Sequence, residues 1–224
     1  TLVLPVTTEY FGESFYQVSR EDQFKVFIKA TDETLMERSF RILKEQGIET
    51  IIVGCGHQGV HYEGLQEKYG LKIYYNHEYA STGSLYTMVL SDEHVSEDFL
   101  LLESDLLYEP RALVTLIDET RENLVLASGT THSGDEVYVE AKEDNELVQL
   151  SKNRADINEL KGELVGISRI SRSTLDKLIE LVKQDEKWKN NNYEEGLVEV
   201  ASAQDIKVKL VEDLVWCEID SEIH

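Results

Sequence analysis

Basic residues, cysteine and proline are all scarce in this sequence. The chain has 22 Lys and Arg against 44 Asp and Glu, a formal net charge of -22, which argues against nucleic acids and anionic membranes as partners. Its two cysteines, Cys55 and Cys217, form no disulfide framework, so we expect a reducing, cytoplasmic location. No apolar run approaches the roughly 20 residues of a membrane span. A polyanionic ligand would therefore need local Lys or Arg, backbone N–H groups or a divalent cation.

The 224 residues suffice for one α/β domain with a full core, so we expect a single domain over residues 1–224; a longer multidomain chain around it stays open. Short apolar runs alternate with segments of helical periodicity, which predicts a Rossmann-like, doubly wound α/β fold with a mixed, mainly parallel sheet and helices on both faces. The first expected strands are 1–8, 50–54 and 71–75, and the first helix is 32–46, with Asp32 as its cap.

Acidic side chains follow the most apolar strand of the chain. Phe99 to Pro110 reads FLLLESDLLYEP, and four consecutive apolar residues suit a central strand that is buried on both faces. Asp105 then falls in the crevice where open α/β sheets bind ligands, and a carboxylate there needs a cation or hydrogen-bond donors. We expect Mg²⁺, and a turn cap before Pro110 remains the alternative.

A second strand, at the end of the chain, also ends in carboxylates. The segment 215–220, VWCEID, delivers Glu218 and Asp220 two residues apart and so on one face of the strand. A hard divalent ion in a phosphate-handling site takes one or two protein carboxylates, so Asp105 and Asp220 can share one cation. Two independent surface acids in so acidic a chain are the other explanation.

The second half of the chain is expected to carry a polar loop, a hairpin and two helices. The loop 76–84, NHEYASTGS, places Thr82, Gly83 and Ser84 near a helix N-terminus, where free N–H groups can meet carbonyls or phosphates. An ordinary Ser/Thr-capped loop explains this composition equally well. The remaining expected elements are a strand at 124–127, a hairpin at 134–150, a strand at 163–170, helices at 173–183 and 193–203, a solvated linker at 184–192 and a strand at 206–210.

Six stretches taken together resemble a known family. FLLLESDLLYE, NHEYASTGS, SGTTHSGDEVYVE, SKN, GELVGIS and VWCEIDSEIH stand in the order found in sugar-nucleotide-type nucleotidyltransferases, and most resemble the 2-aminoethylphosphonate cytidylyltransferases, close to the phosphocholine cytidylyltransferases. The resemblance runs from about residue 33 to the end. It implies transfer of CMP from CTP to 2-aminoethylphosphonate with release of pyrophosphate, and phosphocholine or a related aminoalkyl phosphate is the alternative acceptor.

The resemblance also implies roles for individual residues. Mg²⁺ would be held by Asp105 and Asp220 with Glu218 as nearby support, and Thr82, Gly83 and Ser84 would face the cytosine. Lys25 matches a lysine that contacts the triphosphate. Charge neutralisation on the pyrophosphate or the acceptor would fall to Lys25 and Lys152, because an acceptor oxyanion needs no general base. The acceptor's ammonium would be met by Asp135, Glu163 and Glu194.

One segment departs from the family pattern. The family's Gly-rich phosphate loop, L-A-A-G-x-G-x-R, corresponds here to Thr8–Gln17, TEYFGESFYQ, which has one glycine, no arginine and two acids. Side chains would crowd the close approach that glycines allow, and the acids would repel phosphates. Two interpretations stay open: an active enzyme with an altered N-terminal segment, or a catalytically impaired nucleotide-binding module.

Overall fold

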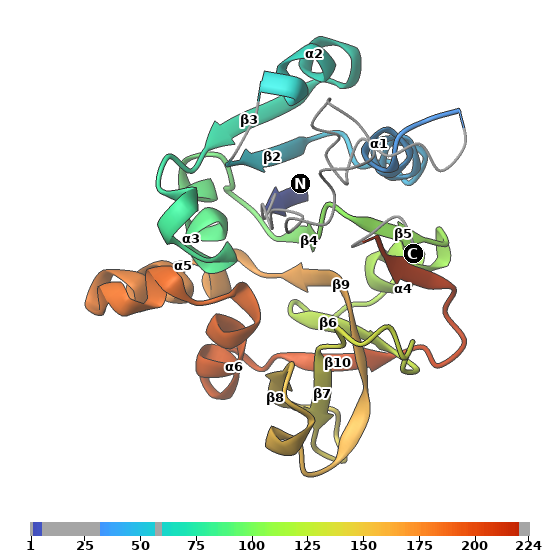
Figure 1. Ribbon diagram of the computed structural model, residues 1–224, viewed down its shortest axis with the longest axis vertical. Helices are drawn as coiled ribbons and strands as arrows, with labels where there is room; N and C mark the ends of the chain where they lie inside the picture. Colours follow the sequence, from blue (N-terminus) through green and yellow to red (C-terminus); the bar gives the residue numbers. More distant parts are fainter. Residues whose placement is uncertain (1, 6–31, 57–59, 220–224) are drawn as a thin grey trace, which may run out of the picture.

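The computed structural model describes residues 2–5, 32–56 and 60–219. A nine-stranded mixed sheet runs through the molecule in the order β10-β6-β9-β4-β1-β2-β3, with β7 and β8 attached at β9 (Figure 1). The strands are β1 (Leu2–Pro5), β2 (Ile51–Cys55), β3 (Leu71–Tyr75), β4 (Phe99–Leu102), β6 (Leu124–Ser128), β7 (Tyr138–Ala141), β8 (Leu147–Ser151), β9 (Leu160–Ile170) and β10 (Lys207–Leu210).

The strands β1 to β4 and the pair β6–β10 are parallel, as the alternation of strands and helices predicts. The exception is β9, which runs antiparallel between β4 and β6. The expected single-domain α/β fold with a mixed, largely parallel sheet is therefore confirmed, and the expected strands at 50–54, 71–75, 124–127 and 206–210 match their observed counterparts closely.

Helices cover both faces of this sheet (Figure 1). Successive strand residues point to opposite faces, so Ile52 packs into one apolar cluster while Ile51 and Val53 pack into the other. The first cluster includes residues of α3 (Ser84–Val89), α5 (Arg172–Gln184) and α6 (Tyr193–Gln204); the second includes residues of α1 (Leu35–Glu45), α2 (Val60–Tyr69) and α4 (Arg111–Ile117). Among the described residues, no helix combines the length and apolarity that a membrane span requires.

The cap of α1 differs from the sequence prediction. Thr34, not Asp32, caps the helix: its Oγ1 accepts from Glu37 N at 3.1 Å, and Thr34 N donates to Glu37 Oε2 at 3.3 Å. This reciprocal capping box satisfies two backbone donors at once, which an isolated Asp two residues earlier cannot do. Gly47, with φ of 79°, follows the end of the helix as expected.

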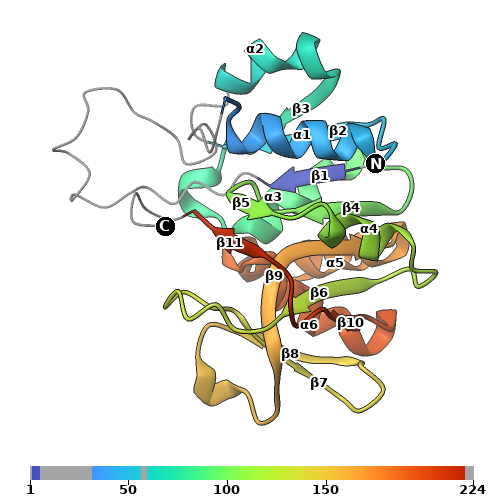
Figure 2. The ribbon, with the colours of Figure 1, turned by 90° about the vertical axis from the view of Figure 1, so that its right-hand side faces the viewer.

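Two short strands that lie outside the main sheet bring the acidic segments together. β5 (Leu106–Tyr108) follows β4 after a tight turn and pairs antiparallel with β11 (Trp216–Glu218), and Figure 2 shows the two strands side by side. The register sets Glu218 opposite Leu106, and Ile219 N donates to Asp105 O at 3.0 Å. The sequence analysis did not predict β5 as a separate strand.

The expected linker at 184–192 is mostly exposed, as predicted, but it is not an irregular connection. It contains the 3₁₀ helix η6 (Glu186–Asn190), in which the partly buried Trp188 packs against the apolar core. Lys189 O accepts a hydrogen bond from Gly83 N at 2.7 Å, so the segment is tied to the loop before α3. The Lys- and Asn-rich composition gave no sign of these contacts. The other short helices are η3 (Tyr79–Ser81), η4 (Leu90–Glu93) and η5 (Arg154–Asp156).

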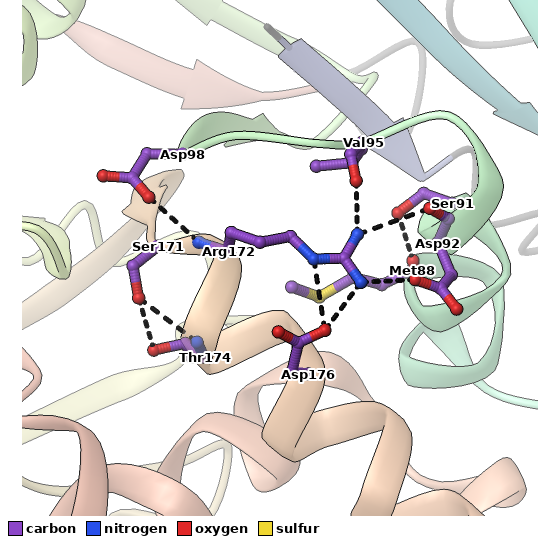
Figure 3. Close-up of polar contacts among 9 residues, drawn as sticks. All are labelled: Met88, Ser91, Asp92, Val95, Asp98, Ser171, Arg172, Thr174 and Asp176. Atoms are coloured by element: carbon purple, nitrogen blue, oxygen red, sulfur yellow. Dashed lines mark hydrogen bonds and ion pairs between the residues drawn. The ribbon is translucent and has the colours of Figure 1, made fainter.

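Arg172, at the start of α5, ties that helix to η4 and to the chain leading into β4 (Figure 3). Its guanidinium donates to Asp176 Oδ1 at 2.6 Å, to Val95 O and to Asp92 Oδ1, and its backbone N donates to Asp98 Oδ1 at 3.0 Å. The planar fork of arginine serves several acceptors at once. This contact set fixes the helical layer that holds α3.

Candidate active site

The acidic segments meet at the edge of the sheet where β4 ends. Asp105 lies in the turn between β4 and β5, and Glu218 is the last residue of β11, which pairs with β5. The two acidic segments lie side by side, because Ile219 N bonds to the backbone O of Asp105 at 3.0 Å, and the shared cation stays a prediction. Asp220, the expected partner of Asp105, lies outside the described residues.

Glu103 is the first polar residue after β4, and its carboxylate is held by specific contacts. Its backbone N donates to Gly166 O at 2.9 Å, and its Oε1 accepts from Tyr193 Oη at 2.5 Å. Gly166 leaves the room for this side chain, since a Cβ there would lie 2.7 Å from Glu103 Oε2. Burial raises the pKa of Glu103 well above its usual value, and the nearby carboxylates of Glu194 and Glu218 raise it further.

Glu194 is a second buried carboxylate of this cluster. It is the second residue of α6, next to Tyr193, and its Oε2 is buried without a hydrogen-bond partner among the described residues. Burial raises the pKa of Glu194 to about 7, although its own backbone N–H and Lys152 act in the opposite direction. Buried carboxyl oxygens are normally hydrogen-bonded, so an unpartnered one beside other acids favours a cationic ligand.

Lys152 and Asp135 form an ion pair beside the cluster. Lys152 Nζ lies 2.9 Å from Asp135 Oδ1, and both side chains are about half exposed. Lys152 follows β8 and also lowers the pKa of Glu194, which places its charge near that carboxylate. The structure thus brings together three of the residues expected around the acceptor: Asp135, Lys152 and Glu194.

Glu163, the fourth of these residues, is held by a different loop. It lies on β9 and is 3% exposed; its Oε2 accepts from Thr131 N at 2.5 Å and its Oε1 from Thr131 Oγ1 at 2.9 Å. Burial raises the pKa of Glu163, and these two hydrogen bonds lower it. Both of its oxygens already have donors, so its clearest observed role is to fix the loop around Thr131.

The segment expected to face the nucleotide precedes α3. Thr82 Oγ1 accepts from Asn76 Nδ2 at 3.0 Å and donates to Glu78 O at 3.0 Å, while Gly83 is in direct backbone contact with η6. Ser84 is only 4% exposed, and its Oγ accepts from Tyr193 N at 2.9 Å. Thr82 and Gly83 are partly exposed, whereas the hydroxyl of Ser84 is used inside the protein.

Some residues singled out in the sequence lie outside the described residues or outside this cluster. Lys25, the segment 8–17 and Asp220 lie outside the described residues. Glu109, the third acid after β4, bonds to Arg111 Nη2 at 2.7 Å and to Val215 N at 3.0 Å, so it braces β11. Sequence reasoning assigned no role to Tyr193; its position at the start of a helix that carries Glu194 was the available signal.

The donor set fits a magnesium ion only in combination with a phosphate ligand. Within the described ranges, no group of three or more His, Cys, Asp or Glu side chains is arranged to hold a metal. Magnesium in phosphate-handling sites needs just one or two carboxylates, because phosphate oxygens and waters complete its octahedron. Asp105 and Glu218, from neighbouring strands, can supply this small number of oxygen ligands.

The sequence was compared with known families and curated proteins. No model of a known protein family matches it. The choline-phosphate cytidylyltransferase of Streptococcus pneumoniae (strain ATCC BAA-255 / R6) is 27% identical over 89 residues, which are 40% of this chain and 39% of that protein. The match therefore spans about two fifths of the length of the curated relative.

Two solved structures superpose on almost the whole length of this chain. The inositol-1-phosphate CTP transferase from T. maritima superposes with a TM-score of 0.78 at 20% identity, covering 99% of this chain and 89% of that one. The CTP:phosphocholine cytidylyltransferase from Streptococcus pneumoniae gives 0.74 at 19% identity, with 99% and 93% covered. The chain therefore has the fold of these two structures, that of the nucleotide-diphospho-sugar transferases.

Proposed function

We propose that this protein is a cytidylyltransferase that transfers CMP from CTP to a small aminoalkyl phosphonate or phosphate, with 2-aminoethylphosphonate as the leading acceptor. The observation that carries the proposal is the carboxylate cluster at the end of β4. Glu103 and Glu194 are both partly buried, and the Oε2 atom of Glu194 is fully buried with no hydrogen-bond partner among the described residues. A cation would offset the cost of keeping these acids together.

The composition of the cluster favours a primary ammonium over a quaternary one. A primary ammonium donates three hydrogen bonds, which carboxylate oxygens accept strongly. A quaternary ammonium has no N–H, and aromatic faces are its best-known partners. The hydroxyl of Tyr193 is directed at Glu103, and the charged groups that raise the pKa of Glu103 are all acids, namely Glu194, Glu218 and Asp105. This supports 2-aminoethylphosphonate ahead of phosphocholine.

The reaction needs placement and charge neutralisation rather than a base. An acceptor oxyanion attacks the α-phosphorus of CTP; a P–O bond forms, the α–β phosphoanhydride bond breaks, and its electron pair leaves with pyrophosphate. Lys152, close to Glu194, would neutralise the acceptor's anion, and Asp135 and Glu194 would face its ammonium. Lys25 would neutralise the triphosphate, and Thr82 and Gly83 would border the cytosine.

Magnesium, if bound, would be held by Asp105 and Asp220 with Glu218 beside them. It would draw charge from the phosphate oxygens and so ease the attack. The residues of this chain set the position of that charge: β5 and β11 hold Asp105 and Glu218 together, and Ile219 N bonds to Asp105 O at 3.0 Å.

The proposal is tested by incubating the protein with CTP, MgCl₂ and 2-aminoethylphosphonate and measuring pyrophosphate. We expect release that depends on both substrates, that EDTA abolishes, and that Asp105→Asn lowers at least about 100-fold, as the loss of a metal-binding charge does. Asp118→Asn, an exposed acid at the end of α4, is the matched control and should be unaffected. A higher kcat/KM for phosphocholine than for 2-aminoethylphosphonate would identify phosphocholine as the preferred acceptor.

The same experiment separates a second candidate. The segment 8–17, with one glycine and two acids in place of a Gly-rich phosphate loop, favours a nucleotide-binding module without catalysis. CTP binding by calorimetry with no pyrophosphate above a blank would establish that alternative and reject the transferase.

A further inference from the structure

The loop expected to face the nucleotide and the helix that carries the acceptor carboxylates are joined by direct contacts. Gly83 N donates to Lys189 O at 2.7 Å, and Leu85 N donates to Asn191 O at 3.3 Å. A Cβ on Gly83 would lie 2.2 Å from Asn191 O and 3.0 Å from Asn190 O. The two segments therefore pack backbone against backbone, and neither can move without the other.

Ser84 extends this contact to the first residue of α6. The first N–H groups of a helix have no partner inside the helix, and a side-chain oxygen normally satisfies them. Here the oxygen comes from another element: Ser84 Oγ accepts from Tyr193 N at 2.9 Å, across 109 residues of sequence. Asn192, beside it, is held in turn by Glu195, since Asn192 N donates to Glu195 Oε2 at 2.8 Å.

Tyr193 connects the start of α6 to the carboxylate cluster. Its hydroxyl donates to Glu103 Oε1 at 2.5 Å, and the next residue is Glu194. The helix start is further held because Gly196 leaves no space for a larger residue: a Cβ there would lie 2.9 Å from a methyl group of Leu85, in α3. The positions of Glu103 and Glu194 thus depend on α3 and the loop before it.

We propose that Ser84 and Gly83 are positioning residues for the acceptor, and that the loop bordering the nucleotide sets the geometry of the acceptor's ammonium site. This inference rests on the proposed function and deepens it. The buried hydroxyl of Ser84 holds the start of α6, and through Tyr193 it holds the carboxyl groups of Glu103 and Glu194. The affinity for the acceptor therefore depends on Ser84, although Ser84 belongs to the segment expected to border the nucleotide.

The test is calorimetric binding of 2-aminoethylphosphonate and, separately, of CTP to the wild type and to Ser84→Ala. We expect the variant to bind 2-aminoethylphosphonate about three- to tenfold more weakly, the range of one lost neutral hydrogen bond, and to bind CTP within about twofold of the wild type. Ser81→Ala is the matched control: its exposed hydroxyl donates to Glu78 O at 3.2 Å, three residues earlier in the same loop, and both affinities should stay unchanged.

Gly83→Ala provides a second, stronger perturbation. Its added methyl group meets backbone atoms of Asn191 that cannot move without shifting α6, so we expect more than a tenfold loss of 2-aminoethylphosphonate affinity. Unchanged acceptor affinity in either variant overturns the inference, and so does an equal loss of both ligands in Ser84→Ala. A wild type that binds no 2-aminoethylphosphonate overturns it as well. Binding without pyrophosphate release rejects the transferase activity alone.

Discussion

Tyr193 Oη donates a hydrogen bond of 2.5 Å to Glu103 Oε1, and this contact joins the start of α6 to the end of β4. The two residues are 90 positions apart in the sequence. Glu103 directly follows β4 and Tyr193 is the first residue of α6, so regular structure fixes the backbone beside both residues. The pair therefore links the helical layer to the acidic edge of the sheet, where the candidate active site lies.

The Tyr193–Glu103 hydrogen bond should make stability depend on pH in a specific way. It stabilises the ionised carboxylate and so opposes the burial that raises the pKa of Glu103. Tyr193→Phe should therefore lower the free energy of unfolding by about 1–3 kcal/mol at pH 8, and by less at pH 5, because a lower pH favours the protonated form of Glu103. Urea unfolding at both pH values measures this. Tyr86→Phe, which removes an exposed bond to Glu78 Oε1, is the control; equal losses at both pH values would contradict the account.

Glu194 should destabilise the fold as the pH rises. Burial raises its pKa to about 7 in the folded protein, whereas the pKa of a glutamate in the unfolded chain lies near its ordinary value of 4.5. Between these values the folded state binds more protons, so the free energy of unfolding falls as the pH increases from 5 to 8. Glu194→Gln, which cannot ionise, should remove about 1–3 kcal/mol of this decrease. If the free energy of unfolding falls equally with pH in the wild type and in Glu194→Gln, Glu194 is not the source of the decrease.

Gly166 should be needed for space as well as for backbone conformation. Its φ is 75°, and a Cβ would lie 2.7 Å from Glu103 Oε2. Gly47 has nearly the same φ, 79°, but no atom within 4 Å of the added Cβ. Gly47→Ala should cost about 1 kcal/mol from backbone strain alone. Gly166→Ala should cost about 1–3 kcal/mol more, because Glu103 must also shift. Thermal or urea unfolding of both variants measures the difference. Equal losses in the free energy of unfolding would show that the Glu103 side chain can move aside without cost.

Arg172 should contribute to the stability of the fold through its contacts with η4 and with the chain before β4. Arg172→Met removes bonds to Asp92, Val95 and Asp176, and we expect a loss of about 2–3 kcal/mol in the free energy of unfolding. Lys177→Met is the control on the same helix, since its exposed pair with Glu180 should contribute less than about 0.5 kcal/mol. Urea unfolding compares the two. A loss in Arg172→Met no larger than that in Lys177→Met would show that the contacts in Figure 3 are dispensable.

The sequence by itself determined the main course of the chain. Apolar runs such as Phe99–Leu102 and Ile51–Cys55 form buried strands because their side chains are best placed away from water, and their period and length are local properties. The same reasoning located Asp105 and Glu218 at strand ends. It missed the short helix at Glu186–Asn190, where the polar composition outweighed the partly buried Trp188, and it chose Asp32 as a cap where Thr34 provides the better one.

Only the tertiary structure decided which side chains meet. The pairing of β5 with β11 brings Asp105 beside Ile219, and the packing of α3 against α6 turns Ser84 from a candidate nucleotide contact into a support for Tyr193. Such contacts join residues more than a hundred positions apart, and they depend on the order and direction of strands and on the room left by Gly83 and Gly166. A local sequence pattern indicates whether its own segment forms a helix or a strand. It does not indicate which distant segment will pack against it.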